Sequence, residues 1–242
     1  MTRVVIASNN AGKLAELSAM LGPLGFETVP QGELGVPEAE EPHHTFVENA
    51  LAKARNCARH TGLAALADDS GLCVDALGGA PGVHSAHFAG CHGSREERDR
   101  ANNALLVEKL AGRADRAAHY ASVALVPGER EAQRRQQDAA NNALLLQRLL
   151  GATTRRASFV CTLVALRSAE DPQPLVATGR WQGEILAGAR GQGGFGYDPL
   201  MFIPALGATV AELPRELKNV HSHRALACIH MLQMMREVWG LA

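Results

Sequence analysis

Hydrophobic residues at the start of the chain follow first an extended and then a helical pattern. Val4–Ala7 is a short apolar run that predicts a buried strand. Leu14, Leu17 and Leu21 then recur at helical spacing, and Gly22-Pro23 ends that pattern. The sequence therefore predicts a strand, a polar loop and a helix, in that order.

A second helix is expected to begin just after Thr45. Thr45 and Glu48 have the spacing of a capping box, and the apolar stripe that follows them ends near Gly62. Asn49 and Lys53 are one turn apart and share a different face of this helix. The polar face of the helix thus carries one amide and one cation.

Further apolar runs predict more strands and a last helix. The expected strands are Leu63–Ala67, Val74–Leu77, Ala157–Leu166, Leu175–Trp181 and Met201–Ile203. The runs at 157–166 and 175–181 are expected to pair, and a final helix begins after Ser222, which is suited to be its N-cap. The order of strands and helices is that of an α/β protein.

Composition and charge exclude several classes of protein. The chain has 242 residues, of which 46% are hydrophobic, so it can bury a core as one large domain or two small lobes. The net charge is −1 and the basic residues are scattered, which argues against binding to nucleic acid. Five separated cysteines without a C-x-x-C pattern fit a reducing cytoplasm. No stretch approaches the roughly 18 apolar residues of a membrane span.

The middle of the chain contains an internal repeat. Residues 102–112 match residues 141–151, 39 positions further on, with seven of eleven residues identical. The similarity continues weakly from 120–126 to 159–165, so the repeated unit is one helix followed by one strand. Two copies are too few for a solenoid, and a local duplication is the simpler interpretation.

Two polar segments are expected as loops where strands end. Ser8–Lys13 lacks the first glycine of a Walker A loop, but its small residues, its Asn amides and its lysine suit an oxyanion. An ordinary turn from strand to helix is the other interpretation. Asp68–Gly71 offers two adjacent carboxylates, which either bind a hard cation together with substrate phosphates or cap the following segment. Ligands of open α/β sheets bind at such strand ends.

Two more segments carry chemistry in the last third of the chain. Gly191–Pro199 combines four glycines with Phe195 and Tyr197, whose flat rings suit a nucleotide base. A long hairpin connection with aromatic plugs explains it equally well. Lys218 and the cluster His221–Arg224 offer donors without matching acceptors, and a solvated helix start is the alternative.

Six motifs, taken together and in order, resemble the Ham1/RdgB family of inosine/xanthosine triphosphate pyrophosphatases. They are Ser8–Lys13, Thr45–Ala50 with Lys53, Ala67–Leu72, Gly79–Gly82, Gly193–Pro199 and Ser222–Arg224. Each motif is weak alone, but together they span nearly the whole chain.

The resemblance implies an α/β fold: an elongated mixed β-sheet with flanking helices, in two lobes around a central cleft. Residues 1–242 then form a single domain, usually a homodimer in this family. The implied activity is Mg²⁺-dependent hydrolysis of deaminated purine nucleoside triphosphates (ITP, dITP and XTP) to the monophosphate and pyrophosphate, in the cytoplasm. The substrate is thus the expected partner, with no nucleic acid and no membrane.

The resemblance also implies a role for individual residues. Asp69 is the expected general base, and Glu40 and Asp69 are the expected Mg²⁺ ligands, with Glu41 and Asp68 left open as further ligands. The expected substrate-binding residues are Ser8, Asn9, Asn10, Ala11, Gly12 and Lys13 at the triphosphate, Lys53 as a second phosphate clamp, and Ser70, Phe195, Gly196, Tyr197, Asp198, Lys218, His223 and Arg224 around the nucleotide. Donors at the base would select a 6-keto purine over adenine.

The chain departs from the family pattern in two places. The segment 82–87 has histidines where relatives commonly carry Tyr and Arg. The family also has one helix-strand unit where this chain has two, so we take about 98–135 as the additional copy. That copy is expected to extend a sheet edge, to replace the strand of the second copy or to pack outside.

Two other functions stay open at this point. One is a Maf-like pyrophosphatase, which cleaves nucleoside triphosphates in the same way but prefers other bases. The other is a nucleotide-binding module in which the duplication has abolished turnover. The products formed from a panel of nucleoside triphosphates distinguish all three.

Overall fold

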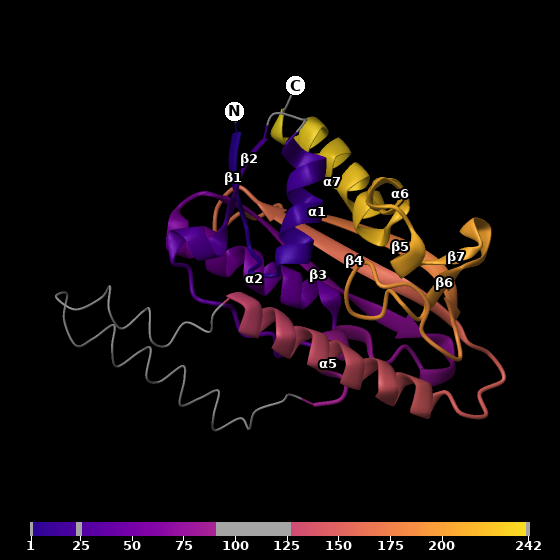
Figure 1. Cartoon of the computed structure of the whole chain (residues 1–242). Coiled ribbons are helices and arrows are strands. Elements are labelled where there is room, and N and C mark those ends of the chain that lie inside the picture. Colours follow the sequence, from indigo (N-terminus) through magenta and orange to yellow (C-terminus); the bar gives the residue numbers. More distant parts are fainter. Residues whose placement is uncertain (1, 23–25, 91–126, 241–242) are drawn as a thin grey trace, which may run out of the picture.

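The structure, a computed structural model, describes residues 2–22, 26–90 and 127–240 (Figure 1). Its strands are β1 (Thr2–Ile6), β2 (Phe26–Pro30), β3 (Ala64–Val74), β4 (Arg156–Leu166), β5 (Leu175–Ile185), β6 (Met201–Ile203) and β7 (Ala208–Thr209). Its α-helices are α1 (Ala11–Leu21), α2 (Phe46–Thr61), α5 (Pro127–Arg148), α6 (Arg215–His221) and α7 (His223–Trp239).

All the strands in the described residues belong to one mixed sheet of seven, in the order β2-β1-β3-β4-β5-β6-β7. β1 is parallel to both of its neighbours, and every other pairing is antiparallel. The expected α/β fold with a mixed sheet and flanking helices is therefore confirmed. In the described residues, no helix is long and apolar enough to cross a membrane.

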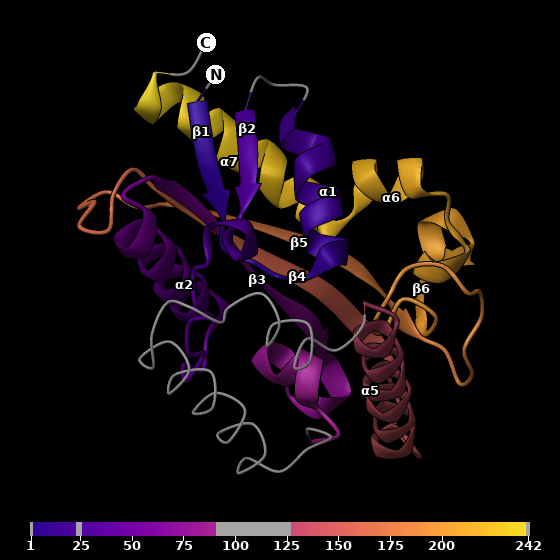
Figure 2. The ribbon, with the colours of Figure 1, turned by 60° about the vertical axis from the view of Figure 1, so that its left-hand side comes forward.

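Side chains alternate between the two faces of the sheet, and each face is covered by different helices (Figure 2). Val4 and Ile6 of β1 pack in one core with α1 and α7. Val5 and Ala7, one residue further along, pack in another core with α2. Because successive side chains of this buried strand point to opposite faces of the sheet, the strand contributes to one core on each face.

A third core lies toward the far end of the sheet. Leu145 of α5 and Leu149, which follows the end of that helix, pack there against Phe159, Trp181 and Met201 of three different strands. The long strands β3 and β4 contribute to this core as well as to the first one. They connect a lobe built around β1, α1, α2 and α7 with a lobe built around α5 and β6.

The segment Asp68–Gly71 is not a loop, as the sequence analysis expected, but the middle of β3. β3 pairs with β4 without interruption from Ala65 opposite Leu166 to Val74 opposite Ala157. This ladder satisfies the backbone on one side, and buried partners satisfy the two carboxylates. Polar residues therefore continue the strand where local propensity alone favours a turn.

β1 is shorter than β3, which leaves part of β3 without a neighbouring strand. The β1 pairing ends where Ile6 lies opposite Leu66, and the chain then turns away toward α1. Among the described residues, no strand covers this edge of β3 until Cys73 forms an isolated bridge to Pro81. The central part of β3 is thus accessible from its edge.

Most predicted element ends are confirmed. Thr45 caps α2 by accepting from the Glu48 N–H, Gly62 ends that helix in the left-handed conformation, and Ser222 caps α7 by accepting from the Ala225 N–H. The strand expected at Val74–Leu77 is wrong.

β3 ends at Val74, and Asp75–Leu77 forms one turn of 3-10 helix that ends at Gly78. Gly78 has a φ of 60°, a left-handed conformation that stops the extended backbone.

The second copy of the repeat supplies a central strand. Its helix is the end of α5 and its strand is β4, which lies between β3 and β5. The strand of the second copy has therefore not been replaced. The first copy, 102–126, lies outside the described residues, and the proposed insertion at 98–135 remains a prediction apart from its last residues, which begin α5.

Helix α7 packs directly on the backbone of β5 at Gly179. A Cβ atom at this position would lie 2.0 Å from the carbonyl oxygen of His223 and 2.6 Å from the backbone nitrogen of Ala227. The first turn of α7 therefore approaches the sheet as closely as it does only because residue 179 has no side chain.

We predict that Gly179→Ala lowers the free energy of unfolding by about 1–3 kcal/mol, because the added methyl group must push α7 away from β5. Urea unfolding followed by circular dichroism measures this. Gly22→Ala is the control, since a Cβ there has nothing within 4 Å and φ is −54°. Equal effects of the two substitutions would contradict the packing argument.

Candidate active site

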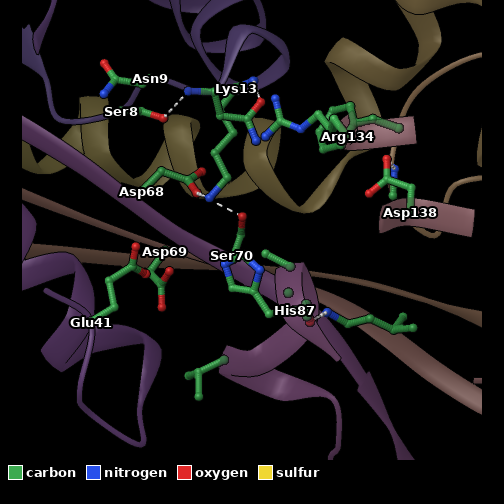
Figure 3. Close-up of a pocket in the computed structure, with 18 of the residues that line it drawn as sticks. Ser8, Asn9, Lys13, Glu41, Asp68, Asp69, Ser70, His87, Arg134 and Asp138 are labelled. Carbon is green, nitrogen blue, oxygen red and sulfur yellow. Dashed lines mark hydrogen bonds and ion pairs between the residues drawn. The ribbon is translucent and has the colours of Figure 1, made fainter. Parts of the chain in front are cut away.

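A cavity of about 820 Å³ lies along the free edge of β3 (Figure 3). The loop after β1 and the starts of α1 and α7 line one part of it. Lys53 of α2 and residues of the acidic loop Glu38–Glu41 before that helix line another. The 3-10 helix Gly82–His87, α5 and the loop Phe195–Asp198 complete the lining. Both lobes thus contribute to one site.

The predicted phosphate loop Ser8–Lys13 lies at this cavity, but two of its side-chain amides form hydrogen bonds within the protein. Oδ1 of Asn10 accepts from the N–H groups of Gly12 at 3.0 Å and Lys13 at 3.2 Å, which caps α1. Nδ2 of Asn9 donates to Glu38 at 2.9 Å. Ser8, Asn9, Asn10 and Lys13 line the cavity, whereas Ala11 and Gly12 do not.

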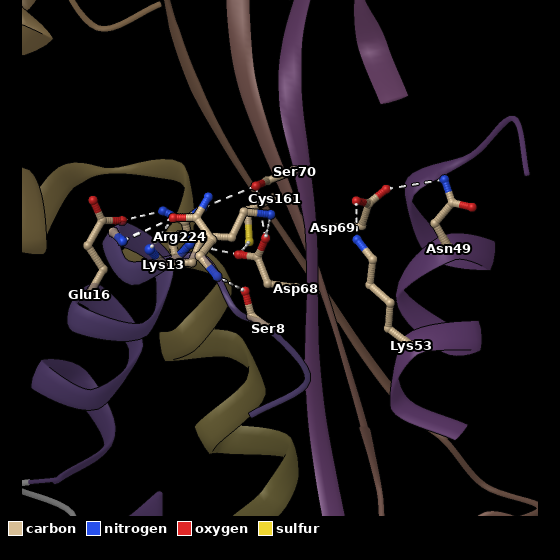
Figure 4. A network of polar contacts seen from close by, with 12 residues as sticks. Ser8, Lys13, Glu16, Asn49, Lys53, Asp68, Asp69, Ser70, Cys161 and Arg224 are labelled. Atoms are coloured by element: carbon tan, nitrogen blue, oxygen red, sulfur yellow. Dashed lines mark hydrogen bonds and ion pairs between the residues drawn. The ribbon is translucent and has the colours of Figure 1, made fainter. Parts of the chain in front are cut away.

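Asp68 and Asp69 point to opposite faces of β3, because adjacent residues of a strand alternate. Figure 4 shows Asp68 on the side of Lys13 and Arg224, and Asp69 on the side of Lys53 and α2. Both carboxylates line the cavity, because the cavity lies at the edge of the sheet and extends to both faces of β3. They do not form the adjacent metal-ligand pair that the sequence pattern suggested.

On the face of Asp68, six charged side chains alternate in sign. They are, in order of contact, Lys13, Asp68, Arg224, Glu16, Lys218 and Asp198. Nζ of Lys13 lies 2.5 Å from one oxygen of Asp68, and the other oxygen accepts from Nε of Arg224 at 2.7 Å. The guanidinium of Arg224 is only 1% exposed.

The second half of this series connects α1 with α6. Glu16 of α1 pairs with Arg224 through one oxygen and with Lys218 through the other, at 3.0 Å. Lys218 also lies 2.8 Å from Asp198. The donors of Lys218 and Arg224 thus have acceptors, contrary to the sequence-based expectation. Both side chains are buried, so the alternative of a solvated helix start is wrong as well.

The series fixes the charge state of its members. Burial alone would raise the pKa of Asp68, but the charges of Arg224 and Lys13 outweigh burial and hold it well below its usual range. Burial likewise opposes the charge of Arg224, but Asp68 and Glu16 raise the pKa of that guanidinium. Asp68 is therefore a permanent anion with fixed partners.

On the opposite face, Asp69 belongs to a smaller cluster. Nζ of Lys53 lies 2.8 Å from Oδ1 of Asp69 and 2.6 Å from Oε2 of Glu41. Nδ2 of Asn49 donates to the other oxygen of Asp69 at 3.4 Å. Burial raises the pKa of Asp69 despite the charge of Lys53. The predicted shared face of Asn49 and Lys53 is thus the face toward Asp69.

The acidic loop presents Glu41 rather than Glu40 to this cluster. Glu41 lines the cavity and pairs with Lys53, whereas Glu40 does not line it. Spacing in the sequence alone gave no way to choose between them.

The glycine-rich segment does form an aromatic loop at the cavity. Nζ of Lys218 lies 4.5 Å from the centre of the Phe195 ring, within range of a cation–π contact. The hydroxyl of Tyr197 is buried and donates to the carbonyl oxygen of Ser85 at 2.9 Å. Phe195 thus lines the cavity with its ring, while Tyr197 anchors the loop.

His223 lies at the start of α7 with one ring nitrogen free. Its ring stacks on Phe159 at 5.0 Å between ring centres, and its Nδ1 is buried without a hydrogen-bond partner. Burial, reinforced by the charge of Arg224, lowers the pKa of His223 well below its ordinary value. The neutral imidazole therefore adds a polar group to the cavity without a charge.

Comparison with known proteins agrees with this arrangement. The Ham1 family model matches residues 4–133 and 126–234. The chain belongs to the Ham1 family. Relatives described as dITP/XTP pyrophosphatases include one from Leptothrix cholodnii, 58% identical over 99% of this chain and 100% of the relative. Another, from Methylibium petroleiphilum, is 60% identical over 98% of this chain and 99% of the relative.

Among solved structures, a HAM1 protein from Coxiella burnetii is similar with a TM-score of 0.75 and 36% identity, over 98% of this chain and 100% of that one. The two lobes and the mixed sheet described above are therefore those of a Ham1 fold.

Cations and carboxylates nearly balance along the lining of the Ham1 cavity. The lining cations are Lys13, Lys53, Arg134, Lys218 and Arg224, and the lining carboxylates are Glu38, Glu41, Asp68, Asp69, Asp138 and Asp198. A triphosphate would add several negative charges to this surface, so its binding favours an additional cation. Within the described residues no three metal-binding side chains gather. Two carboxylates with substrate phosphates and water are a common Mg²⁺ environment.

Two residues of this site could not be recognised from the sequence pattern. Glu16 occupies a helical position between apolar neighbours, where a charged residue usually faces solvent, yet it is 6% exposed. Asp138 belongs to no recognised motif. It lies on α5, on the other side of Figure 3 from Glu41 and Asp69. Both owe their position to contacts between segments far apart in the sequence.

We predict that Asp68→Asn lowers the free energy of unfolding by about 3–5 kcal/mol, because it leaves the buried charge of Arg224 partly uncompensated. Chemical denaturation at neutral pH measures this. Asp75→Asn removes an exposed ion pair with Arg156 and should change stability by less than about 1 kcal/mol. A similar small change for Asp68→Asn would show that the series is not stabilising.

Proposed function

We propose that the chain hydrolyses deaminated purine nucleoside triphosphates, namely dITP, ITP and XTP, to the nucleoside monophosphate and pyrophosphate. One observation carries this proposal: a cation at a helix start, Lys13, and a carboxylate cluster, Asp69 with Glu41 and Lys53, line the same cavity. The relatives at 58% and 60% identity are described as dITP/XTP pyrophosphatases, which supports the same activity.

Asp69 and Glu41 are the residues that would hold Mg²⁺. Both carboxylates already gather around a single positive charge, Nζ of Lys53, at 2.8 and 2.6 Å. When bound, Mg²⁺ supplies positive charge for the phosphate oxygens and orients the substrate. Glu41 replaces Glu40 in this proposal because Glu40 does not line the cavity.

The reaction joins one water to the α-phosphorus and breaks the bond between that phosphorus and the oxygen bridging to the β-phosphorus. Asp69 orients the water and accepts its proton, and pyrophosphate leaves with the bond electrons. The protein contributes mainly position and charge in such a transfer. Asp69 suits this task because Lys53 and Asn49 fix both of its oxygens.

Two lysines are suited to compensate the charge that develops on the phosphates. Lys13 extends from the first turn of α1, and Lys53 lies across the edge of β3. Each is paired with an aspartate in the described structure, Lys13 with Asp68 and Lys53 with Asp69. These carboxylates hold the ammonium groups at the cavity before a substrate arrives.

Selection of the base depends on which polar groups remain unpaired. Lys218 and Arg224 are largely satisfied by carboxylates, whereas Nδ1 of His223 is not. Donors among these three residues pair with the 6-keto oxygen of a deaminated purine but face the amino group of adenine. Such a mismatch costs about 1–3 kcal/mol per unpaired buried group.

A panel of nucleotides tests the activity. With Mg²⁺, the chain should convert ITP, dITP and XTP to monophosphate and pyrophosphate far faster than ATP or dTTP, and Asp69→Asn should lower turnover by orders of magnitude without unfolding. Chromatography of the products and circular dichroism of the variant measure both. Preference for another base would contradict the proposed selection of deaminated purines, and absence of any product would indicate a binding module.

We predict that Glu41→Gln raises the Mg²⁺ concentration needed for half-maximal turnover by tenfold or more, because a neutral amide is a poor ligand for a hard cation. Glu40→Gln is the matched control, since the same change is made one residue away, and its Mg²⁺ dependence should be that of the wild type. A reversal of the two results would restore Glu40 as the ligand.

The homodimer and the cytoplasmic location that the resemblance implies remain predictions. They are supported by membership of the Ham1 family and by the pattern of cysteines in the sequence. Analytical ultracentrifugation of the full chain measures the first.

A further inference from the structure

Two side chains of α5, one turn apart, hold the backbone on both sides of Gly196. The N–H of Gly196 donates to Oδ2 of Asp138 at 2.8 Å. Nδ2 of Asn142 donates to the carbonyl oxygen of Gly196 at 3.1 Å. Gly196 has a φ of 62°, a conformation that glycine adopts at little cost. The backbone of the aromatic loop is therefore fixed from α5 at this residue.

Phe195 is the side chain whose position follows from this contact. A Cβ atom on Gly12 would lie 2.8 Å from Cε1 of Phe195, so the ring lies directly against the first turn of α1. Lys218 lies on the ring at 4.5 Å, and the N–H of Phe195 donates to Asp198 at 2.9 Å. The ring thus contacts the first turn of α1 and Lys218, on a backbone held through the N–H of Phe195 and at Gly196.

The same helix also holds the 3-10 helix Gly82–His87, another part of the cavity wall. Nδ2 of Asn141 donates to the carbonyl oxygens of Ser85 and Ala86, and its Oδ1 accepts from the N–H of Ala89. Tyr197 of the aromatic loop donates to the same Ser85 carbonyl. α5 therefore links the aromatic loop and the 3-10 helix Gly82–His87 into one unit.

We propose that Asp138 is a positioning residue for the base-binding side of the cavity. Through Gly196 it holds Phe195 where the flat ring can pack against a purine. The proposal rests on the function proposed above, because it assigns the base to the side of Phe195 and the phosphates to the side of Lys13. Asp138 acts at the backbone and needs no contact with the nucleotide itself.

Two ligands separate this role from a general effect on folding. Inosine monophosphate carries the base, whereas pyrophosphate carries only the phosphate part. Asp138→Ala should weaken binding of inosine monophosphate about tenfold and leave the affinity for pyrophosphate within about twofold, measured by calorimetry on the full chain. With ITP, KM should rise by a similar factor while kcat changes little.

Asp138→Asn tests the chemistry of the contact. Asparagine keeps an oxygen that can accept from the Gly196 N–H, so this variant should regain affinity for inosine monophosphate to within about threefold of the wild type. Asp99→Ala is the matched control, because Asp99 lies three residues before the first copy of the repeat, as Asp138 lies three residues before the second. We expect it to bind both ligands as the wild type does.

Several results would overturn the proposal. Equal weakening of both ligands by Asp138→Ala would indicate a merely structural role, and unchanged binding would exclude any role. A loss with Asp99→Ala as large as that with Asp138→Ala would assign the contact to the other copy. Failure of the underlying function is seen separately, as a wild-type chain that cleaves no deaminated purine triphosphate, and it would overturn both proposals.

Discussion

The site depends on β3 running straight through it as a paired strand. Because β4 pairs with the whole of β3, the alternation of side chains continues through the two adjacent aspartates. Asp68 is thereby directed to the core under α1 and α7, and Asp69 to the side of α2. Asp68 thus belongs to the buried series of ion pairs, whereas Asp69, an identical side chain one residue later, belongs to the carboxylate cluster with Glu41.

The ionic series explains how a polar site can have a rigid wall. Lys13, Arg224 and Lys218 belong to three different helices, and Asp68 and Glu16 connect them. Buried ion pairs add little net stability compared with apolar packing, but they are costly to break one partner at a time. The relative positions of α1, α6 and α7 are therefore tied to the positions of charges that line the cavity.

The elements with strong local signals could be predicted from the sequence, and the directions of polar side chains could not. Thr45, Gly62 and Ser222 end or begin helices as their local chemistry indicates. Asp68–Gly71 reads as a turn, because only the distant β4 makes it a strand. The choice of Glu41 over Glu40 and the burial of Glu16 likewise depend on contacts between distant segments.

The early end of β1 determines how much room the molecule has for a ligand. β1 stops opposite Leu66, whereas β3 continues to Val74. Had the first strand run on for a few more residues, its backbone would fill the space in which the cavity now lies. The space for a ligand therefore exists because, among the described residues, no strand pairs with this edge of β3 beyond Leu66. The length of β1 alone decides whether this edge of the sheet is paired or forms a binding site.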